Sequence, residues 1–268
     1  MRVTFLVDNY VDQPSLKAEH GFSCLIEFNG KKFLFDTGQT DAVFENAKKI
    51  GVDLKTLDFI VLSHGHYDHT GGLISILDKS VKVYASEKIF MEHLRQNKDG
   101  SYCYIGINRY IVKNFSKNFI FNEDLLEIEN NIFISGTIKR KVEFDSDKNL
   151  FKNVDNAIAK DDFPDEQYLV VKEDEDFSIF TGCSHAGIVN ILEDFYEKFG
   201  NKRINFLVGG FHLFRSSYDE VNSVIDYLMG KEIRHIFTGH CTGLEALLQM
   251  KLKLGGRLVP IKVGMVVG

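Results

Sequence analysis

The sequence predicts a mixed α/β (α+β) fold, with a two-layered sheet core and helices outside. Three observations predict it. Apolar runs rich in β-branched residues follow one another through about the first 60 residues, as expected for strands that pair locally. In the last hundred residues, strand-like runs alternate with helical runs. A chain of 268 residues is also long enough to bury one such core, so we predict a single domain spanning 1–268.

The first part of the chain predicts mostly strands. A helical run between residues 40 and 50 places Phe44, Ala47 and Ile50 on one helical face. Another helix is expected through Met91 and Leu94. The runs expected to form strands are RVTFLV (2–7), FSCLIEF (22–28), KFLFD (32–36), LDFIVLS (57–63) and VKVYAS (81–86).

The segment from about 97 to 165 is predicted to be a variable insertion or lid over the functional site. It contains three strand-like runs, RYIVKNF, NFIFN and NIFIS, separated by polar turns. The stretch FKNVDNAIAKDDFPDE has no clear period and carries clustered acids, which indicates a surface loop.

The second half is more regular. QYLVVK and DFSIFTG indicate a hairpin, and RINFLVGG and RHIFTG indicate further strands. RLVPIKVGMVV predicts a terminal strand or pair of strands. The predicted helices are Ile188–Phe199, Tyr218–Met229 and Leu244–Leu254.

Composition limits the possible functions. The net charge is −6 and the sequence lacks the clustered basic residues of a nucleic-acid-binding protein, so no nucleic-acid partner is expected. No apolar stretch reaches the length of a membrane span, and no signal peptide is visible. The cysteines are scattered and form no CxxC pair, which favours a reducing, cytoplasmic environment; they are Cys24, Cys103, Cys183 and Cys241.

The stretch Ser63–Gly72, SHGHYDHTGG, holds three histidines and an aspartate in a predicted strand-to-helix loop. His64, His66 and Asp68 are spaced two apart, whereas Asp68 and His69 are adjacent and must diverge. One loop could therefore supply two pairs of ligands to two neighbouring ions. Imidazole and carboxylate are suitable ligands for zinc and similar divalent metals.

Further candidate ligands follow three other predicted strands. Cys183 and His185 follow DFSIFTG, His212 follows INFLVGG, and His240 follows HIFTG. Ligands in open α/β folds bind beyond the carboxyl ends of strands, so these side chains are expected to converge. By contrast, structural roles are expected for two other histidines, His93 in a helical surface pattern and His235 inside a strand.

These motifs resemble those of the metallo-β-lactamase superfamily. HGHYDH resembles its HxHxDH motif, FLFDTG its early aspartate-bearing strand, and GH at 239–240 its last metal histidine. The strings EHGFS, FDTGQT, TGCSHAGIVN, GGFHL and GHCTG resemble a branch of metal-dependent hydrolases that includes the dihydropterin ribofuranosylaminobenzene phosphate synthase type. The resemblance implies an αββα sandwich with a two-metal site at one edge.

The resemblance also implies roles for individual residues. His64 and His66 would bind the first ion, and Asp68, His69 and His240 the second. The resemblance further implies that Asp68 holds the attacking water. Asp36 and His20 would orient the metal ligands. His212 would bind substrate or act as a general acid.

The sequence departs from the family at TGCSHAG. Cys183 stands where the bridging aspartate commonly is, and the usual third histidine of the first site has no counterpart between His93 and His185. His185 is the favoured replacement; an acid such as Asp165, or an incomplete first site, are the alternatives. Cys183 could bridge the ions as a thiolate or simply pack.

The function expected from the resemblance is hydrolysis of a small-molecule substrate, a phosphate ester among others, by water activated at a dinuclear site. The expected cofactor is two Zn²⁺ ions, with Fe or Mn as alternatives. A second hypothesis is a synthase that condenses a phosphoribosyl donor with a pterin-related or aromatic acceptor. A third is a metal or ligand sensor with little turnover, and a redox role with iron is also open.

Overall fold

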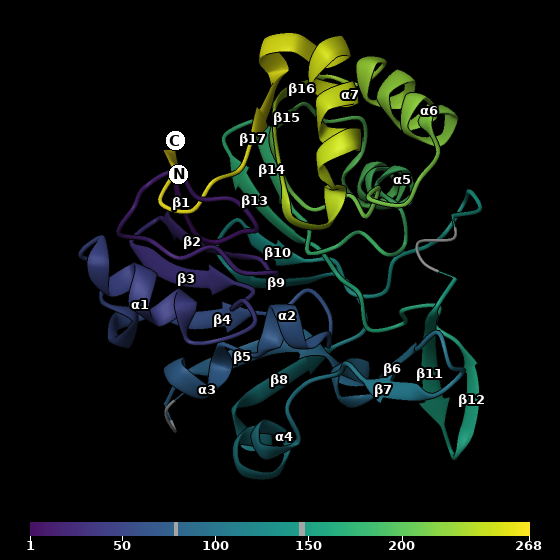
Figure 1. Ribbon diagram of the computed structural model, residues 1–268. Coiled ribbons are helices and arrows are strands. Elements are labelled where there is room, and N and C mark those ends of the chain that lie inside the picture. The colour runs from purple at the N-terminus through teal and green to yellow at the C-terminus, as the bar shows by residue number, and fades with distance from the viewer. Residues whose placement is uncertain (78–79, 145–147) are drawn as a thin grey trace.

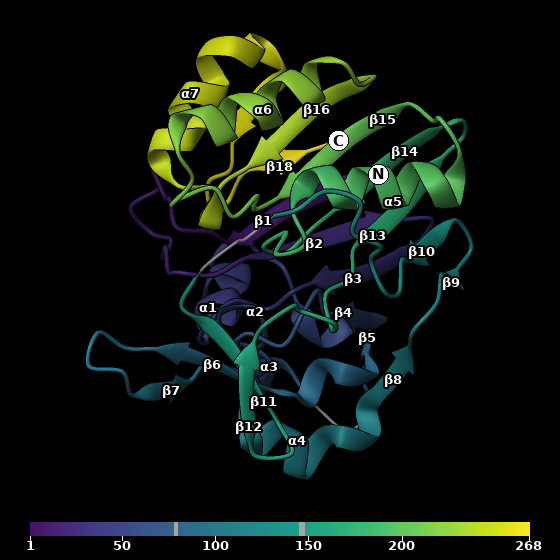
Figure 2. The ribbon, with the colours of Figure 1, turned by 90° about the vertical axis from the view of Figure 1, so that its right-hand side faces the viewer.

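The computed structural model describes residues 1–77, 80–144 and 148–268. Its centre is formed by two seven-stranded sheets that pack face to face, with helices on their outer faces (Figure 1). The chain termini lie close together, because the last strand pairs with the first (Figures 1 and 2).

The first sheet has the strand order β18-β1-β2-β3-β4-β5-β8. Neighbours from β18 to β3 are antiparallel, and neighbours from β3 to β8 are parallel. The strands are β1 (Arg2–Val7), β2 (Ser23–Phe28), β3 (Lys31–Phe35), β4 (Phe59–Val61), β5 (Lys82–Ser86), β8 (Phe119–Asn122) and β18 (Val266–Val267).

The second sheet repeats this arrangement. Its order is β17-β16-β15-β14-β13-β10-β9, antiparallel from β9 to β14 and parallel from β14 to β17. The strands are β9 (Leu126–Glu129), β10 (Ile132–Ile134), β13 (Leu169–Glu173), β14 (Asp176–Phe180), β15 (Ile204–Gly209), β16 (Ile233–Thr238) and β17 (Leu258–Pro260).

Helices cover both outer faces. The helices are α1 (Ala42–Lys49), α2 (Tyr67–Thr70), α3 (Leu73–Ile76), α4 (Arg109–Phe115), α5 (Ile188–Phe199), α6 (Tyr218–Met229) and α7 (Leu244–Leu254). In Figure 2, α5, α6 and α7 lie over the second sheet, and α1 to α4 lie on the side of the first. The bounds of α5, α6 and α7 are those predicted from the sequence.

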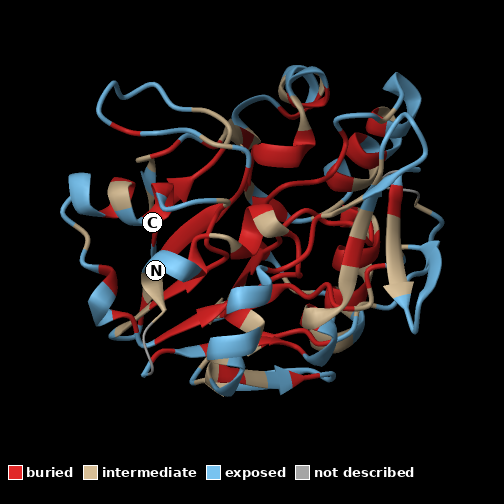
Figure 3. Cartoon of the chain, turned by 60° about the horizontal axis from the view of Figure 1, so that its bottom comes forward, coloured by how far each residue is buried: buried red, intermediate tan, exposed pale blue. Residues whose placement is uncertain are grey.

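Three apolar cores hold these four layers together. One lies between the sheets, where Phe35 and Phe59 of the first meet Phe180 and Val208 of the second. A second joins α5–α7 to the outer face of the second sheet, and a third joins α1, α3 and α4 to the first sheet. The central strands are accordingly buried, while the outer helices and loops carry the exposed residues (Figure 3). The predicted αββα sandwich is therefore confirmed.

The segment from 97 to 165 contributes to all three sheets that the described residues form; its residues 145–147 lie outside the described residues. It supplies β8 to the first sheet and β9 and β10 to the second. Its other strands join β6 in a small sheet of order β12-β11-β6-β7, at the lower right in Figure 1. The small sheet consists of β6 (Glu92–Gln96), β7 (Tyr102–Tyr104), β11 (Leu150–Val154) and β12 (Ala157–Lys160).

Three secondary-structure predictions between residues 87 and 160 were wrong. RYIVKNF forms α4, because the Asn108 side chain caps it by accepting from the Tyr110 backbone N–H, and Ile111 is buried. FKNVDNAIAK forms the β11–β12 hairpin, whose turn places Asp155 and Asn156 at positive φ, a conformation that suits tight hairpins. The helix predicted through Met91 and Leu94 is instead a 3₁₀ turn, Glu87–Phe90, followed by β6.

The inner face of α1 also differs from the prediction. Val43, Asn46 and Ala47 are buried, whereas Phe44 is partly exposed at 38%. Asn46 is inside because its side-chain amide donates to the backbone carbonyls of Leu6 and Lys17. A pattern based on apolar residues alone misses this face, because its central residue is a hydrogen-bonded amide.

Among the described residues, we find no helix with the length and apolar character needed to cross a membrane.

Candidate metal centre

The candidate metal ligands lie at one edge of the sandwich, at the carboxyl ends of parallel strands from both sheets. His64 and His66 follow β4, and Asp68 and His69 lie in the short helix α2. The ligands from the second sheet are Cys183 and His185 after β14, His212 after β15 and His240 after β16. All are buried, although each belongs to a loop or a short helix, so this edge carries a cluster of buried polar side chains.

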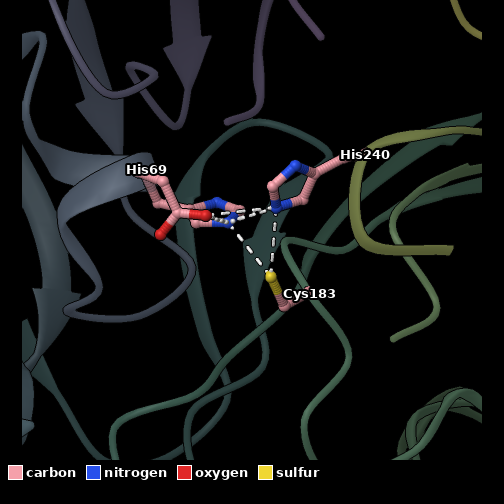
Figure 4. Close-up of side chains that lie close together, drawn as sticks. His69, Cys183 and His240 are labelled. Atoms are coloured by element: carbon pink, nitrogen blue, oxygen red, sulfur yellow. Dashed lines mark hydrogen bonds and ion pairs between the residues drawn. The ribbon is translucent and has the colours of Figure 1, made fainter. Parts of the chain in front are cut away.

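Asp68, His69, Cys183 and His240 form one compact group. Figure 4 shows His69, Cys183 and His240 of this group pointing toward one another. The Nε2 atom of His69 lies 3.1 Å from the Cys183 Sγ and 3.2 Å from the His240 Nε2. The Cys183 Sγ is 3.4 Å from the His240 Nε2, which is in turn 3.3 Å from the Asp68 Oδ2. One potential ligand atom from each residue thus faces a common point.

A second group of potential ligand atoms contains His64, His185 and again Cys183. The His66 ring lies beside it, with its centroid 4.7 Å from that of His64 and 4.8 Å from that of His185. The His64 Nε2, the His66 Nε2 and both ring nitrogens of His185 are buried without a hydrogen-bond partner among the described residues. Buried polar atoms normally have partners, so these nitrogens fit a divalent cation that accepts their lone pairs.

Cys183 belongs to both groups, which places its sulfur between the two candidate ion positions. It also belongs to a third group of potential ligand atoms, with His212 and Cys241. Burial raises the pKa of the Cys183 thiol, so a thiolate here at neutral pH needs adjacent positive charge. The sulfur is therefore within reach of both groups of candidate ligand atoms, as a bridging role would require.

Burial keeps the histidines of the second group neutral. It lowers the pKa of His64 and His185 well below the ordinary value and that of His66 to about 3. His69 behaves differently: burial lowers its pKa, but the carboxylates of Asp36 and Asp68 outweigh burial and raise it to about 9. Neutral imidazole is the form that binds a metal ion, so three of these four side chains are ready for one at neutral pH.

Asp36 fixes two of the candidate ligands. Its Oδ2 atom lies 2.7 Å from the His69 Nδ1 and accepts a 2.7 Å hydrogen bond from the Ser63 hydroxyl, while its Oδ1 accepts from the Ser63 backbone N–H. The same hydroxyl lies 2.8 Å from the His64 Nδ1. Both rings therefore turn their Nε2 atoms toward the cluster, as the predicted orienting role requires.

The backbone is strained at this edge. Asp36, Ser184, His212 and His240 all have positive φ, between 45° and 61°, although none is a glycine. Such conformations cost free energy and persist only where the surrounding structure holds them. Four such residues at one edge indicate that the fold holds these side chains in position at the cost of an unfavourable backbone conformation.

The remaining predicted site residues border the same cluster. The His20 Nε2 is 3.2 Å from the Asp68 Oδ2, and its ring contacts that of His240. The His212 ring centroid lies 4.4 Å from that of His185, and its two nitrogens are buried without a partner among the described residues. His235 lies in β16 and packs against Phe206 and Phe237, away from the cluster.

The predicted position of His93 was wrong, whereas its predicted structural role is not contradicted. It is fully buried on β6, not on a helical surface, and its ring centroid lies 5.0 Å from that of His66. Its Nδ1 is 2.6 Å from the Asp161 Oδ2, and its Nε2 is 3.2 Å from the Asp165 Oδ2. Burial lowers its pKa, but the two carboxylates outweigh this and raise the pKa to about 10.

A brace formed by residues 165–167 holds the two ligand loops together. Asp165 accepts a 2.7 Å hydrogen bond from the Gly65 backbone N–H, between His64 and His66. Glu166 accepts from the backbone N–H groups of His185 and Ala186, both at 2.6 Å. Burial raises the pKa of Glu166 to about 7 against the effect of these two bonds. The acids of residues 151–166 were predicted to be surface residues, but Asp161, Asp165 and Glu166 bond inward.

Asp165→Ala is expected to weaken metal binding by about 10- to 100-fold, the range typical for partners of metal ligands. The substitution frees the Gly65 N–H and one side of His93, so the loop that carries His64 and His66 loses its anchor. The measurement is a competitive titration against a metal indicator. Asp162→Ala is the control, because the Asp162 side chain is 65% exposed on the neighbouring turn. Equal affinities for both variants would contradict the brace.

A cavity of about 220 Å³ opens onto the cluster. His66, Asp68, His185 and His240 form its inner end together with Cys183. Its other lining residues that bear on ligand binding are the apolar Ile105, Leu150 and Phe214, and the cationic Arg95 and Arg215. The two arginines belong to no recognisable motif, so they could not be predicted from the sequence.

The αββα fold and the buried set of candidate metal ligands at its edge define the class of protein. The chain belongs to the metallo-beta-lactamase superfamily, whose family model matches residues 16–240 and so includes every strand end described above. Members of this superfamily are usually metal-dependent hydrolases that use divalent metals.

Three relatives illustrate this membership. An uncharacterized protein of Methanocaldococcus jannaschii is 33% identical over 276 residues, which cover 99% of both chains. The 7,8-dihydropterin-6-methyl-4-(beta-D-ribofuranosyl)-aminobenzene-5'-phosphate synthase of the same organism is 29% identical over 263 residues, or 92% of this chain and 89% of the relative. The crystal structure of Tm1679, a metal-dependent hydrolase of the beta-lactamase superfamily, superposes with a TM-score of 0.88 at 33% identity, covering 100% of this chain and 98% of the other. The predicted resemblance is confirmed.

Proposed function

We propose that the protein is a metal-dependent hydrolase that uses a dinuclear metal site to act on a phosphate ester or a related small molecule. One observation carries the proposal: two groups of buried ligand atoms, each drawn from both sheets, share the sulfur of Cys183, which lines a cavity. Two adjacent ions would polarise a phosphoryl or carbonyl oxygen and lower the pKa of a water molecule.

The residues proposed to hold the first ion are His64, His66 and His185, and those proposed for the second are Asp68, His69 and His240, with Cys183 between them. Thiolate, imidazole and carboxylate together suit Zn²⁺, and we propose two zinc ions. Iron and manganese accept most of the same donors. We also propose a cytoplasmic location, since Cys183 must stay reduced to serve as a ligand.

The chain's own residues divide the remaining tasks. Asp68 borders the cavity and His20 contacts its carboxylate, so the pair would orient a water at the cluster. His212 lines the same cavity and has unpartnered ring nitrogens among the described residues, so it would donate a proton to the leaving group. Phe163 stacks on His185, with ring centroids 3.9 Å apart, and excludes solvent from that side.

A synthase is the second candidate, favoured by the relative of that name that matches 92% of this chain. In this case the same cluster would bind the phosphates of a phosphoribosyl donor, and an aromatic or pterin-related acceptor would attack. The residues that would hold the metal are the same, so the two candidates differ in the acceptor: water or an organic nucleophile.

The proposal is tested with purified protein of known metal content. We expect turnover of at least one compound in a screen of phosphate monoesters, phosphodiesters, cyclic nucleotides and lactones. Activity should be lost after dialysis against a chelator and should return on addition of Zn²⁺ or Mn²⁺. Equal turnover by metal-free protein would contradict a metal-dependent reaction. Product formation only when a phosphoribosyl donor and an acceptor are both present would favour the synthase, and metal binding without any turnover would favour a sensor.

A further inference from the structure

We infer that Asn9 is a positioning residue of the site, because its side-chain amide fixes which ring nitrogen of His240 and of His20 carries the hydrogen. The inference rests on the proposed function for the roles of His240 and Asp68. Asn9 belongs to none of the motifs that predict the site. It follows β1, which runs in the same direction as β3 and β4, so it reaches the edge where the candidate ligands gather.

The Asn9 amide has two acceptor sites and two donor hydrogens, and all four have a partner. Its Oδ1 atom lies 3.3 Å from the Gly21 backbone nitrogen and 3.0 Å from the His240 Nδ1. Its Nδ2 atom lies 3.5 Å from the His240 carbonyl oxygen and 3.4 Å from the His20 Nδ1. One half-buried side chain thus joins the end of β1 to two histidines of the site.

Two backbone partners determine which way the amide points. The Gly21 N–H can only donate, so the side-chain atom that faces it must be the oxygen. The His240 carbonyl oxygen can only accept, so the atom that faces it must be the nitrogen. Glycine is required at position 21 for this approach, because a Cβ atom there would lie 2.6 Å from the Asp68 backbone oxygen. The orientation of the amide is therefore set independently of either imidazole ring.

This orientation assigns the hydrogen of the His240 ring. The Asn9 oxygen faces Nδ1, so Nδ1 carries the hydrogen and donates it, and Nε2 keeps its lone pair. That Nε2 atom lies 3.2 Å from the His69 Nε2 and 3.4 Å from the Cys183 Sγ, among the candidate ligand atoms. A metal-binding imidazole usually donates its other N–H to a fixed acceptor, which orients the ring and raises its basicity. Asn9 is that acceptor for His240, as Asp36 is for His69.

The same amide assigns the opposite tautomer to His20. The Asn9 nitrogen faces the His20 Nδ1, so Nδ1 accepts and the hydrogen of the neutral ring lies on Nε2. The His20 Nε2 is 3.2 Å from the Asp68 Oδ2 and so donates to that carboxylate. Asn9 therefore acts on two candidate ligands, on His240 directly and on Asp68 through His20.

The first test is a long-range ¹H–¹⁵N NMR spectrum of the zinc-loaded protein in mildly alkaline buffer, which identifies the protonated nitrogen of each neutral imidazole ring. The chain has nine histidines, and the two signals are assigned from their loss in His20→Gln and His240→Gln. We expect the hydrogen on Nδ1 of His240 and on Nε2 of His20. A hydrogen on Nδ1 of His20, or on Nε2 of His240, would overturn the inference.

The second test compares the zinc affinity of two Asn9 variants by competition with a metal indicator. Asn9→Ala is expected to weaken zinc binding by about 10- to 100-fold, the range typical for partners of metal ligands. Asn9→Asp keeps an acceptor for His240 but has no donor for His20. Its zinc affinity should therefore lie between those of wild type and Asn9→Ala, and its His20 ring should carry a hydrogen on Nδ1.

Asn205→Ala is the matched control. Asn205 is half-buried on β15, and its Oδ1 accepts from Arg234 at the surface. This variant should keep the zinc affinity and both tautomers of the wild type. Affinity of Asn9→Ala within about threefold of wild type would overturn the role of Asn9, and so would equal losses in Asn9→Ala and Asn9→Asp, which a purely structural role would give.

The outcomes also separate this inference from the proposed hydrolase. The expected tautomers and the expected order of zinc affinities, in a protein that hydrolyses nothing, support the role of Asn9 and contradict the hydrolase. Hydrolysis by a wild-type protein whose His20 ring carries its hydrogen on Nδ1 supports the hydrolase and overturns the role of Asn9.

Discussion

Cys183→Ser is expected to reduce metal content at both positions of the cluster, the largest effect of any single substitution in the protein. Its sulfur is the one atom shared by the group with His69 and His240 and the group with His64 and His185. A serine hydroxyl is a much weaker ligand, so the apparent metal affinity should fall by more than about 100-fold, beyond the range for indirect partners. The measurement is elemental analysis after dialysis against a metal-buffered solution.

Cys103→Ser is the control for Cys183→Ser. Cys103 lies on β7 of the small sheet, is partly exposed and belongs to none of the ligand groups found among the described residues. It should retain the wild-type metal content. Circular dichroism of both variants separates loss of metal from loss of fold. If Cys183→Ser kept two ions per chain, the thiol would only pack, and the bridging role would be wrong.

Asp36→Ala is expected to lower the free energy of unfolding by about 3–5 kcal/mol, the cost of removing one member of a buried ion pair. Asp36 is fully buried and faces the His69 ring and the Ser63 hydroxyl and backbone N–H. Without it, these buried groups lose their partner and His69 loses its orientation, so metal affinity should fall as well. Urea unfolding in the presence of a chelator measures the loss in the free energy of unfolding without any contribution from bound metal.

Asp58→Asn is the matched control for Asp36→Ala. The Asp58 carboxylate accepts from the Lys32 backbone N–H and pairs with Lys31 at the surface. Its loss should cost less than about 1 kcal/mol, as exposed pairs do. Equal losses of stability for the two variants would contradict the central role of Asp36.

The sequence predicts the fold well where local pattern and long-range structure agree. The bounds of α5, α6 and α7 follow from regular apolar periodicity, and β1 from a single apolar run. The predictions failed where one polar residue changes the outcome. Asn108 caps α4 in a run that looks like a strand, and Asn46 is a buried hydrogen-bonding residue on the inner face of α1.

The candidate site shows the same division. The residues in contiguous motifs, such as His64 and His69, could be named from spacing alone, and the structure places them side by side. His93 and Glu166 could not be recognised, because their partners lie between 19 and 72 positions away in the chain. A lone histidine or acid carries no local signal of such contacts, so only the folded chain reveals the brace.

Neither sheet carries all of the candidate metal ligands, and the two sheets contribute different numbers of them. The first supplies His64, His66, Asp68 and His69, and the second supplies Cys183, His185 and His240. The Cys183 sulfur meets the ligands of the first sheet only after the two sheets have packed together. Tight metal binding can therefore begin only once both halves have formed their common core. A bound ion would then act as a cross-link between chain segments more than 100 residues apart. Release of the ion would measure the separation of the two halves of the fold, and not the local unfolding of one loop.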